Sequence, residues 1–487
     1  MRNAVCRMMV VFAALFALLT GCQNETVSHD RSMLLRFSRD SVCFDTVFTG
    51  IGSSTQCVMV HNDNRNAVII SDVTMAAGGR YFHINLDGEN QLANLHDIRL
   101  NGGDSLFLFI RVHIDPLDTN TPVLVEDTVR FTVNGNTQSI PLEAYGQDVH
   151  VIRTSKGKTE YTFIQTFEND KPYLVYDTLI AHGSLRFQEG ATLYMHSTAS
   201  IYAHGNVTAQ GTRERPVRIM GDRLDRLFDS VPYRYASGQW GGLFLMHEEA
   251  VGSPKYQLDY TDILSGNIGL YCYSADKNAK GHLVLNNSRI HNHAVYGVAL
   301  LNTDAEITNT EISNCAAYCL YMDGGKQTLT HNTIASFFGW PNSDLNIHTV
   351  AREDVAAVYI NNTDKQQAIT DVSIYNCIIT GARKNNLVLA TPLPDYYTGE
   401  IAGNYIKADS LHAAWCHDNV YANDSDTVFV NAYYKYKEYR YFDFRPDSVS
   451  PARGIGLPER AQSVPLDRDG HSRLPQPDAG CYQYVGP

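Results

Sequence analysis

Apolar positions recur along residues 151–445 at a regular spacing. An isoleucine closes a short strand-like run in each of six copies, which are Ile263, Ile290, Ile312, Ile334, Ile378 and Ile406. Ile290, Ile312 and Ile334 follow one another at intervals of 22 residues, and residues 181–185 (AHGSL) return as residues 203–207 (AHGNV) after the same interval. A period near 22 with about three short strands fits one coil of a parallel β-helix. We therefore expect a right-handed parallel β-helix over residues 151–445, with coils about 4.8 Å apart.

Within each coil the pattern predicts which side chains point inward. Val298 with Leu300, and Leu320 with Met322, should stack from coil to coil as aliphatic ladders. Asparagines precede several of the isoleucines, namely Asn287, Asn309, Asn332, Asn376 and Asn404. We expect them to stack at one turn, where their side chains satisfy backbone groups that the bend leaves unpaired. The excess residues at 337–354 predict an inserted loop, which is where solenoids tend to build binding sites.

Residues 34–150 have a different pattern, in which apolar and polar positions alternate. Runs such as 106–112 and 128–133 alternate strictly, and Asn134-Gly135 favours a tight hairpin. About seven strands in this length are typical of an immunoglobulin-like β-sandwich. The chain is thus expected to be all-β, with this sandwich followed by the β-helix.

The N-terminal residues predict export and a lipid anchor. Arg2 and Arg7 precede the apolar residues 8–19, which are too few to cross a hydrocarbon core of about 30 Å. Residues 19–22 (LTGC) resemble the lipobox of bacterial lipoproteins, which implies a signal peptide at 1–21, lipid attachment at Cys22 and a tether at 22–33. In that family the absence of an acidic residue after the cysteine implies the outer membrane. The expected partner is therefore a membrane, on which lipid chains attached to Cys22 would hold the protein.

Composition removes some classes of partner and site. The net charge is -13, with Lys+Arg at 39 and Asp+Glu at 52, so a nucleic-acid backbone would be repelled. Ten cysteines occur without a Cys-x-x-Cys pair, which argues against a structural zinc site. Cys43 and Cys57 are candidates for a disulfide in an oxidising compartment. Four others lie among apolar repeat positions and are expected to be buried: Cys272, Cys315, Cys319 and Cys377.

The C-terminal residues carry a resemblance to a family. Residues 450–454 (SPARG), 467–470 (DRDG) and 478–482 (DAGCY) resemble the closing segment of bacterial right-handed parallel β-helix proteins. Arg453 stands where that family usually has an acidic residue, and Cys481 stands where alanine is commoner. With the lipobox, the resemblance covers nearly the whole chain. It implies an envelope lipoprotein whose β-helix is closed by residues 446–487, here named the closing segment.

Catalytic motifs of β-helix enzymes are incomplete. Residues 302–304 and 362–364 (both NTD) match the first element of polygalacturonase-like hydrolases, which place paired carboxylates about a glycosidic bond. The sequence has no Asp-Asp pair, no Gly-His-Gly and no Arg-Ile-Lys. Residues 213–218 (RERPVR) do not have the spacing of the arginine motif of pectate lyases. His182 and His204 should stack one coil apart, but two ligands do not make a metal site.

Two functions from different classes follow. The first is a lipid-anchored cell-envelope protein that presents its β-helix surface to a glycan or a surface protein, without catalysis. Aromatic candidates for stacking on sugar rings are Trp340, Tyr396 and Tyr397 and the residues Tyr433, Tyr434 and Tyr436. Trp240, in 238–242 (GQWGG), is expected to form a tight structural turn. The alternative is a polysaccharide lyase, with calcium as its cofactor, or a glycoside hydrolase, with a groove near residues 337–354. The missing motifs favour the first.

Overall fold

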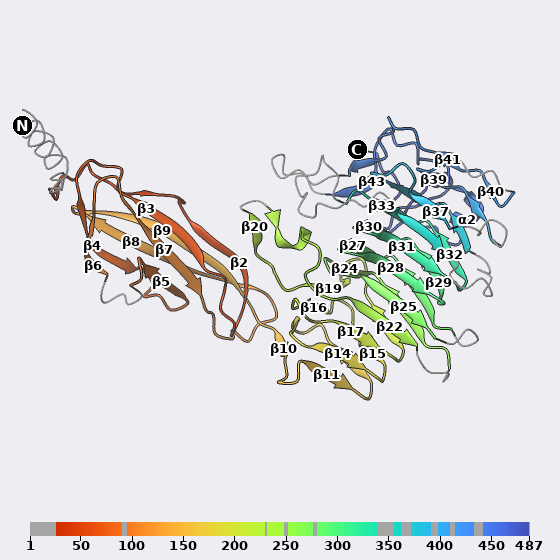
Figure 1. Cartoon of the computed structure of the whole chain (residues 1–487), viewed down its shortest axis with the longest axis horizontal. Helices are drawn as coiled ribbons and strands as arrows, with labels where there is room; N and C mark the ends of the chain where they lie inside the picture. Colours follow the sequence, from red (N-terminus) through yellow and green to blue (C-terminus); the bar gives the residue numbers. More distant parts are fainter. Residues whose placement is uncertain are drawn as a thin grey trace, which may run out of the picture. The chain divides into compact units, whose positions relative to one another are not determined.

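Two compact units make up the chain, Met1–Asp148 and Val149–Pro487. The structure is a computed structural model, and it describes residues 26–89, 95–228, 231–247, 252–275, 280–338, 355–361, 372–390, 398–409, 414–432 and 442–486. Nearly all the regular structure in these ranges is β-strand (Figure 1). Within them, no helix is both long and apolar enough to cross a membrane. The all-β prediction is confirmed.

The first unit is a sandwich of two sheets. One sheet has the antiparallel order β1 (Arg36–Phe37), β3 (Gln56–His61), β7 (Ser105–Val112) and β5 (Phe82–Leu86). The other has the order β2 (Val42–Phe48), β9 (Asn136–Gln147), β8 (Val123–Val133), β4 (Val68–Met75) and β6 (His96–Leu100), with β2 parallel to β9 and the rest antiparallel. Alternate residues of β7, Leu108, Ile110 and Val112, are fully buried between the sheets. The predicted period-two pattern therefore forms the core.

Local features of the sandwich test two predictions. Asn134 and Gly135 both adopt positive φ, 51° and 80°, and Val133 pairs with Asn136, so the tight hairpin is confirmed. The candidate disulfide is wrong, because the thiols of Cys43 and Cys57 are both free. Cys43 lies on β2 and Cys57 on β3, which belong to opposite sheets, and the Cys43 side chain is exposed.

The second unit is a parallel β-helix in which the chain visits three sheets in turn (Figure 1). In the described residues the eleven-stranded sheet contains β10 (His150–Ile152), β13 (Tyr173–Val175), β16 (Thr192–Met195), β19 (Val217–Gly221), β24 (Thr261–Leu264), β27 (Arg289–His293), β30 (Glu311–Cys315), β33 (Thr333–Ser336), β36 (Ile378–Gly381), β39 (Tyr405–Ile406) and β41 (Val420–Tyr421). The nine-stranded sheet, over the same ranges, contains β11 (Lys158–Tyr161), β14 (Thr178–Ala181), β17 (Ile201–Ala203), β22 (Leu243–His247), β25 (Leu270–Ser274), β28 (Tyr296–Leu301), β31 (Tyr318–Asp323), β34 (Val358–Asn361) and β37 (Leu387–Leu389). The ten-stranded sheet of the described chain contains β12 (Gln165–Phe167), β15 (Leu185–Phe187), β18 (Val207–Gln210), β23 (Lys255–Asp259), β26 (His282–Asn286), β29 (Asp304–Thr308), β32 (Gln327–Thr330), β35 (Val372–Tyr375), β38 (Ile401–Ala402) and β40 (Cys416–His417).

Aliphatic ladders fill the interior of the β-helix. Val298 pairs with Leu320, and Leu320 pairs with Val358, all fully buried, so the predicted ladder is confirmed. The four repeat cysteines Cys272, Cys315, Cys319 and Cys377 are buried in the same core, as expected. Each coil therefore leaves three outer faces, one on each sheet, for contacts with other parts of the chain or with ligands.

The asparagines occupy two neighbouring positions of one turn rather than a single one. Asn309 adopts a φ of 51° and its Nδ2 donates to Asn287 Oδ1 at 3.1 Å. In the next coil His331 takes the positive-φ place, and Asn332 falls one position later. Asn332 Oδ1 there accepts the Thr310 backbone N–H at 2.9 Å. Both positions satisfy turn backbone groups, because short polar side chains tolerate left-handed φ and bond locally.

The closing segment lies along the eleven-stranded sheet. Arg468 Nη2 donates to Asp262 at 2.9 Å, and the Cys481 backbone N–H donates to Thr333 Oγ1 at 3.0 Å. The closing segment contains the short helix α2 (Pro458–Ala461), and the strands β42 (Phe429–Asn431) and β43 (Asp443–Pro446) come just before it in the sequence. The strands β20 (Arg226–Phe228) and β21 (Val231–Pro232) and the 3-10 turn Tyr233–Tyr235 belong to an earlier connection between coils. One outer face of the solenoid is thus covered by the chain itself.

Candidate binding face

A line of half-buried aromatic side chains follows the outer face of the nine-stranded sheet. Strand alternation places Leu243 and Leu245 in the core and Phe244 on the outer face between them. The same alternation places Tyr271, Tyr321 and Tyr359 on the outer face of their coils. Tyr296 and Tyr318 stand at the first positions of β28 and β31, and their rings contact Tyr321. The tyrosine stripe, as we name this line, consists of Tyr202, Phe244, Tyr271, Tyr296, Tyr318, Tyr321 and Tyr359.

The rings of the tyrosine stripe stack on one another across coils. Tyr202 and Phe244 have ring centroids 4.6 Å apart and planes within 8°, and the Tyr321 and Tyr359 rings are 5.8 Å apart and within 6°. Register explains the alignment, because Tyr202 pairs with Phe244 and Tyr321 with Tyr359 on adjacent parallel strands. Mutual packing restricts these side chains, so the stripe is a preorganised platform.

Polar groups lie beside the rings. Tyr321 Oη accepts a hydrogen bond from Asn361 Nδ2 at 3.1 Å and lies 3.4 Å from Asp323 Oδ2. Burial raises the pKa of Tyr271 and of Tyr321, so their hydroxyl groups stay neutral near pH 7. A neutral hydroxyl both donates and accepts hydrogen bonds. The stripe therefore combines apolar ring faces with neutral polar edges.

A second group of functional side chains lies beneath the closing segment, around Glu311. Glu311 Oε1 accepts from Arg289 Nε at 3.2 Å and from Ser313 Oγ at 2.7 Å, and Glu311 Oε2 accepts from Tyr482 Oη at 2.7 Å. Burial alone would raise the pKa of Glu311, but the charge of Arg289 and these hydrogen bonds outweigh it and lower the pKa to about 2. The carboxylate is therefore charged and bonded on both oxygens.

The chemistry of this cluster is that of a structural ion pair. A hollow of about 420 Å³ opens beside Arg289, Glu311 and Tyr482. Burial, and then the charge of Arg289, hold the pKa of His291 well below its usual range, so that imidazole is neutral. Glycoside hydrolysis needs one carboxylic acid that keeps its proton and one carboxylate that is free to react. Glu311 keeps no proton and is bonded on both oxygens, whereas burial raises the pKa of Asp469, which lines the same hollow. The cluster fixes the closing segment to the sheet.

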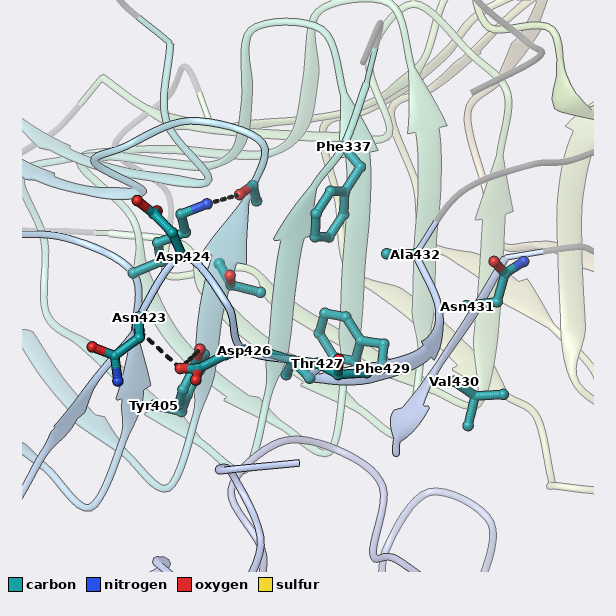
Figure 2. A pocket seen from close by; sticks show the side chains of 14 residues that line it. Phe337, Tyr405, Asn423, Asp424, Asp426, Thr427, Phe429, Val430, Asn431 and Ala432 are labelled. Carbon is teal, nitrogen blue, oxygen red and sulfur yellow. Dashed lines mark hydrogen bonds between the residues drawn. The ribbon is translucent and has the colours of Figure 1, made fainter. Parts of the chain in front are cut away.

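A further hollow of about 310 Å³ lies between the coils and residues 423–432 (Figure 2). Phe337 and Phe429 line one side, with ring centroids 6.3 Å apart. On the other side Tyr405 Oη donates to Asp426 at 2.8 Å, and Lys407 Nζ donates to the Gly381 carbonyl at 3.2 Å. These polar groups are thus bonded to one another within the fold.

The described ranges do not include the main residues that the sequence put forward as sites. Outside these ranges lie most of the predicted insertion at 337–354, residues 362–364, and Cys22, Trp340, Tyr396, Tyr397, Tyr433, Tyr434 and Tyr436. Trp240 is described, and it is fully buried with Nε1 donating to the Leu264 carbonyl at 2.9 Å. It packs within the fold and is not available to a ligand.

The remaining motifs have structural roles. Asn302 Nδ2 donates to the Ser274 carbonyl at 2.9 Å, and Asp304 Oδ1 accepts the Lys326 backbone N–H at 2.9 Å, so residues 302–304 form a bonded turn. His182 and His204 stack with centroids 5.4 Å apart, as predicted. Among the described residues, no group of three or more His, Cys, Asp or Glu is placed to hold a metal ion.

Sequence reasoning missed the tyrosine stripe although its signal was present. The ladder strands contain one aromatic residue between two inward aliphatic ones, as in residues 270–272 (LYC), 320–322 (LYM) and 358–360 (VYI). The inward residues of these strands define the coils, and the aromatic residue between them takes the outward position. Asking which side chains the same register aligns on the outside would have predicted the stripe.

Comparisons with known proteins give little further information. No family model matches the chain, and no curated protein matches it. Among solved structures, a family 123 glycoside hydrolase from Clostridium perfringens aligns at 9% identity and a TM-score of 0.19, covering 26% of each chain. The Vibrio cholerae VesB protease aligns at 14% identity and a TM-score of 0.17, covering 23% of this chain and 31% of that one. The chain thus spans less than a third of either structure, and alignments this partial do not bear on its function.

Proposed function

We propose that this protein is a lipid-anchored cell-envelope protein that binds polysaccharide along the tyrosine stripe, without cleaving it. The observation that carries the proposal is the set of stacked, half-exposed rings aligned by register on one face of a rigid solenoid. Sugar rings have apolar faces of C–H groups and polar edges of hydroxyl groups. Aromatic faces with neutral hydroxyl and amide groups beside them complement both parts.

The anchor rests on residues 19–22, which resemble a lipobox with Cys22 as the acylated residue. Acyl chains contribute about 0.8 kcal/mol per buried CH₂, so more than one chain holds a folded domain on a bilayer. The residue after the cysteine is Gln23, which favours the outer membrane. The protein would then present its solenoid at that membrane.

Binding is favoured over catalysis by the state of the charged cluster. Glu311, which is the most enclosed carboxylate beside the 420 Å³ hollow, is deprotonated and already accepts three hydrogen bonds. A lyase base must be free to take a proton, and a hydrolase acid must hold one. Neither description fits Glu311. Burial raises the pKa of Asp469 in the same hollow, so Asp469 is the residue to replace if cleavage is observed.

The test measures binding and cleavage with the same samples. The protein, purified in mild detergent, is run through native gels containing soluble polysaccharides, and the Tyr321→Ala and Tyr359→Ala variants are compared with it. Each stacked ring contributes about 1 kcal/mol, so each variant should bind about fivefold to tenfold more weakly. Tyr321→Phe keeps the ring and should bind nearly as well as the original.

The matched control is Tyr145→Ala, which removes a tyrosine that is 41% exposed on the sandwich. This variant should be slowed by the polysaccharide in the gel as much as the original protein is. Equal retardation of the stripe variants and the original protein would overturn the proposed site. New reducing ends or unsaturated uronates in the incubated polysaccharide would overturn the non-catalytic role and favour the lyase or hydrolase alternative.

A further inference from the structure

We propose that the ligand of the tyrosine stripe is an uncharged polysaccharide that lies lengthwise along the solenoid, crossing the coils from Tyr202 to Tyr359. This inference rests on the proposed function and adds to it the charge class and the direction of the bound chain. Two properties of the face carry it, namely its charge and its length.

The outer face is almost free of charge. Between β17 and β34 the register aligns two columns of outward side chains on the nine-stranded sheet. The first column is Tyr202, Phe244, Tyr271, Ala299, Tyr321 and Tyr359, in which Ala299 is fully buried, and the second is Met246, Tyr273, Leu301, Asp323 and Asn361. Asp323 is the one ionisable acid or base among these described positions apart from the neutral tyrosines. An acidic polysaccharide would find no guanidinium or ammonium group in either column.

The other two faces hold the charge. On the ten-stranded sheet the outer positions include Arg186, Lys255, Asp259 and Glu306. On the eleven-stranded sheet the register aligns Arg218, Asp262, Arg289 and Glu311 in one column of alternating sign. The sequence as a whole has a net charge of -13, which repels a polyanion. The uncharged face is therefore selective by charge as well as by shape.

The direction of the chain follows from the stacking of coils. The columns cross six strands, β17, β22, β25, β28, β31 and β34, and adjacent strands lie about 4.8 Å apart, so the stripe is about 24 Å long. Rings follow one another across strands from Tyr202 through Phe244 to Tyr271, and from Tyr321 to Tyr359. On β28 the ring is that of Tyr296, which contacts Tyr321 of the next strand at 5.6 Å between centroids. A chain that lies along the solenoid axis meets a new coil every few ångströms, whereas a chain that lies across it meets one coil. Affinity should therefore increase with the length of the bound chain until the stripe is filled.

The experiment compares charge classes and chain lengths on the full protein in mild detergent. Neutral probes are hydroxyethyl cellulose, galactomannan and soluble starch, and acidic probes are polygalacturonate and alginate. We expect at least one neutral polymer to bind tenfold or more tightly than either acidic one. Oligosaccharides of that polymer, from two to eight sugars, should bind progressively more tightly up to about five sugars.

Variants at the two ends of the stripe test the direction. Tyr202→Ala and Tyr359→Ala should each weaken binding of the eight-sugar chain by fivefold or more. A two-sugar chain cannot reach both ends of the stripe. The variant with both substitutions, Tyr202→Ala and Tyr359→Ala, should therefore weaken binding of the two-sugar chain less than it weakens binding of the eight-sugar chain. Phe163→Ala is the control, because Phe163 is 83% exposed and lies outside the stripe.

The outcomes separate this inference from the proposed function. If acidic and neutral polymers bind equally well and Tyr321→Ala abolishes both, the proposal that the ligand is uncharged is overturned. The proposed binding function then still stands. Affinity that does not change beyond two sugars would overturn the lengthwise direction. Absence of any polysaccharide whose binding depends on the stripe would overturn both proposals, and a protein partner captured through the same residues would replace them.

Discussion

Replacing Glu311 by glutamine should destabilise the β-helix by an amount that depends on pH in a defined way. The substitution keeps the size of the side chain and an oxygen that accepts hydrogen bonds, but it removes the charge that faces Arg289 at 3.2 Å. Glu311 is 3% exposed, so solvent screens this charge little. The guanidinium of Arg289 would be left beside a neutral amide.

The magnitude follows from the pKa of Glu311. The ordinary carboxyl value is 4.5, and the folded protein lowers the pKa to about 2, a difference that corresponds to about 3 kcal/mol of stability. Because the folded pKa is the lower one, this contribution is complete above the unfolded value and is lost as the pH falls from about 4.5 through about 2. Glu311→Gln should therefore cost about 3 kcal/mol at pH 7, and about half of that at pH 3.

Urea unfolding followed by tryptophan fluorescence measures this effect on the right unit. The three tryptophans, Trp240, Trp340 and Trp415, all belong to the second of the two units, so their signal reports on the β-helix. Glu306→Gln is the matched control, because Glu306 lies on β29 with a side chain that is 63% exposed, and it should change stability by less than about 0.5 kcal/mol.

A double variant at Arg289 and Glu311 tests whether the two residues act as a pair. Arg289→Met together with Glu311→Gln should recover part of the loss, because no unpaired charge then remains in the cluster. A loss below about 1 kcal/mol for Glu311→Gln at pH 7, or the same loss at pH 3 and pH 7, would refute the account of Glu311 as a charged and buried ion-pair partner.

Three further predictions concern the rest of the chain. Cys43 is exposed and should react with an alkylating reagent in the folded protein, whereas Cys377, whose pKa burial raises to about 12, should react only on unfolding, as mass spectrometry of the labelled protein would show. Asn332→Ala should cost about 2 kcal/mol in urea unfolding, because it leaves two buried backbone groups without their partners. Gly205→Ala should cost about 3 kcal/mol in the same assay, because the new Cβ would lie 2.4 Å from a backbone oxygen of the previous coil, while Gly486→Ala, with open space around it, should be neutral.

The sequence predicts those parts of the fold that repeat. Val298, Leu320 and Val358 could be assigned to one ladder because each coil presents the same pattern, and the structure confirms the assignment. The same repeats contain the outer rings, and the stripe went unrecognised because the candidate sugar-stacking residues were chosen by type, as tryptophans and tyrosine runs. Position in the register was the stronger criterion.

Contacts between residues that are far apart in the sequence could not be predicted in this way. Tyr482 donates to Glu311 across 171 residues of sequence, and no local pattern near either residue specifies the partner. Arg289 and Glu311 directly precede the repeated isoleucines Ile290 and Ile312, and this position does not identify them as partners. The disulfide prediction failed for a related reason, because the 13 residues between Cys43 and Cys57 carry the chain from one sheet of the sandwich to the other.

The division of the solenoid into faces explains why the stripe can work as a platform. The closing segment bonds to several coils, through Arg468 to Asp262, Tyr482 to Glu311 and Arg473 to Asn309. These bonds hold coils at fixed positions from the eleven-stranded side, where charge is neutralised in pairs and covered by the chain. The spacing of rings on the nine-stranded side is then set by the coils themselves and does not have to be formed when a ligand binds. A polymer whose units repeat along its length gains one similar contact per coil from such a surface, whereas a compact ligand gains only the first.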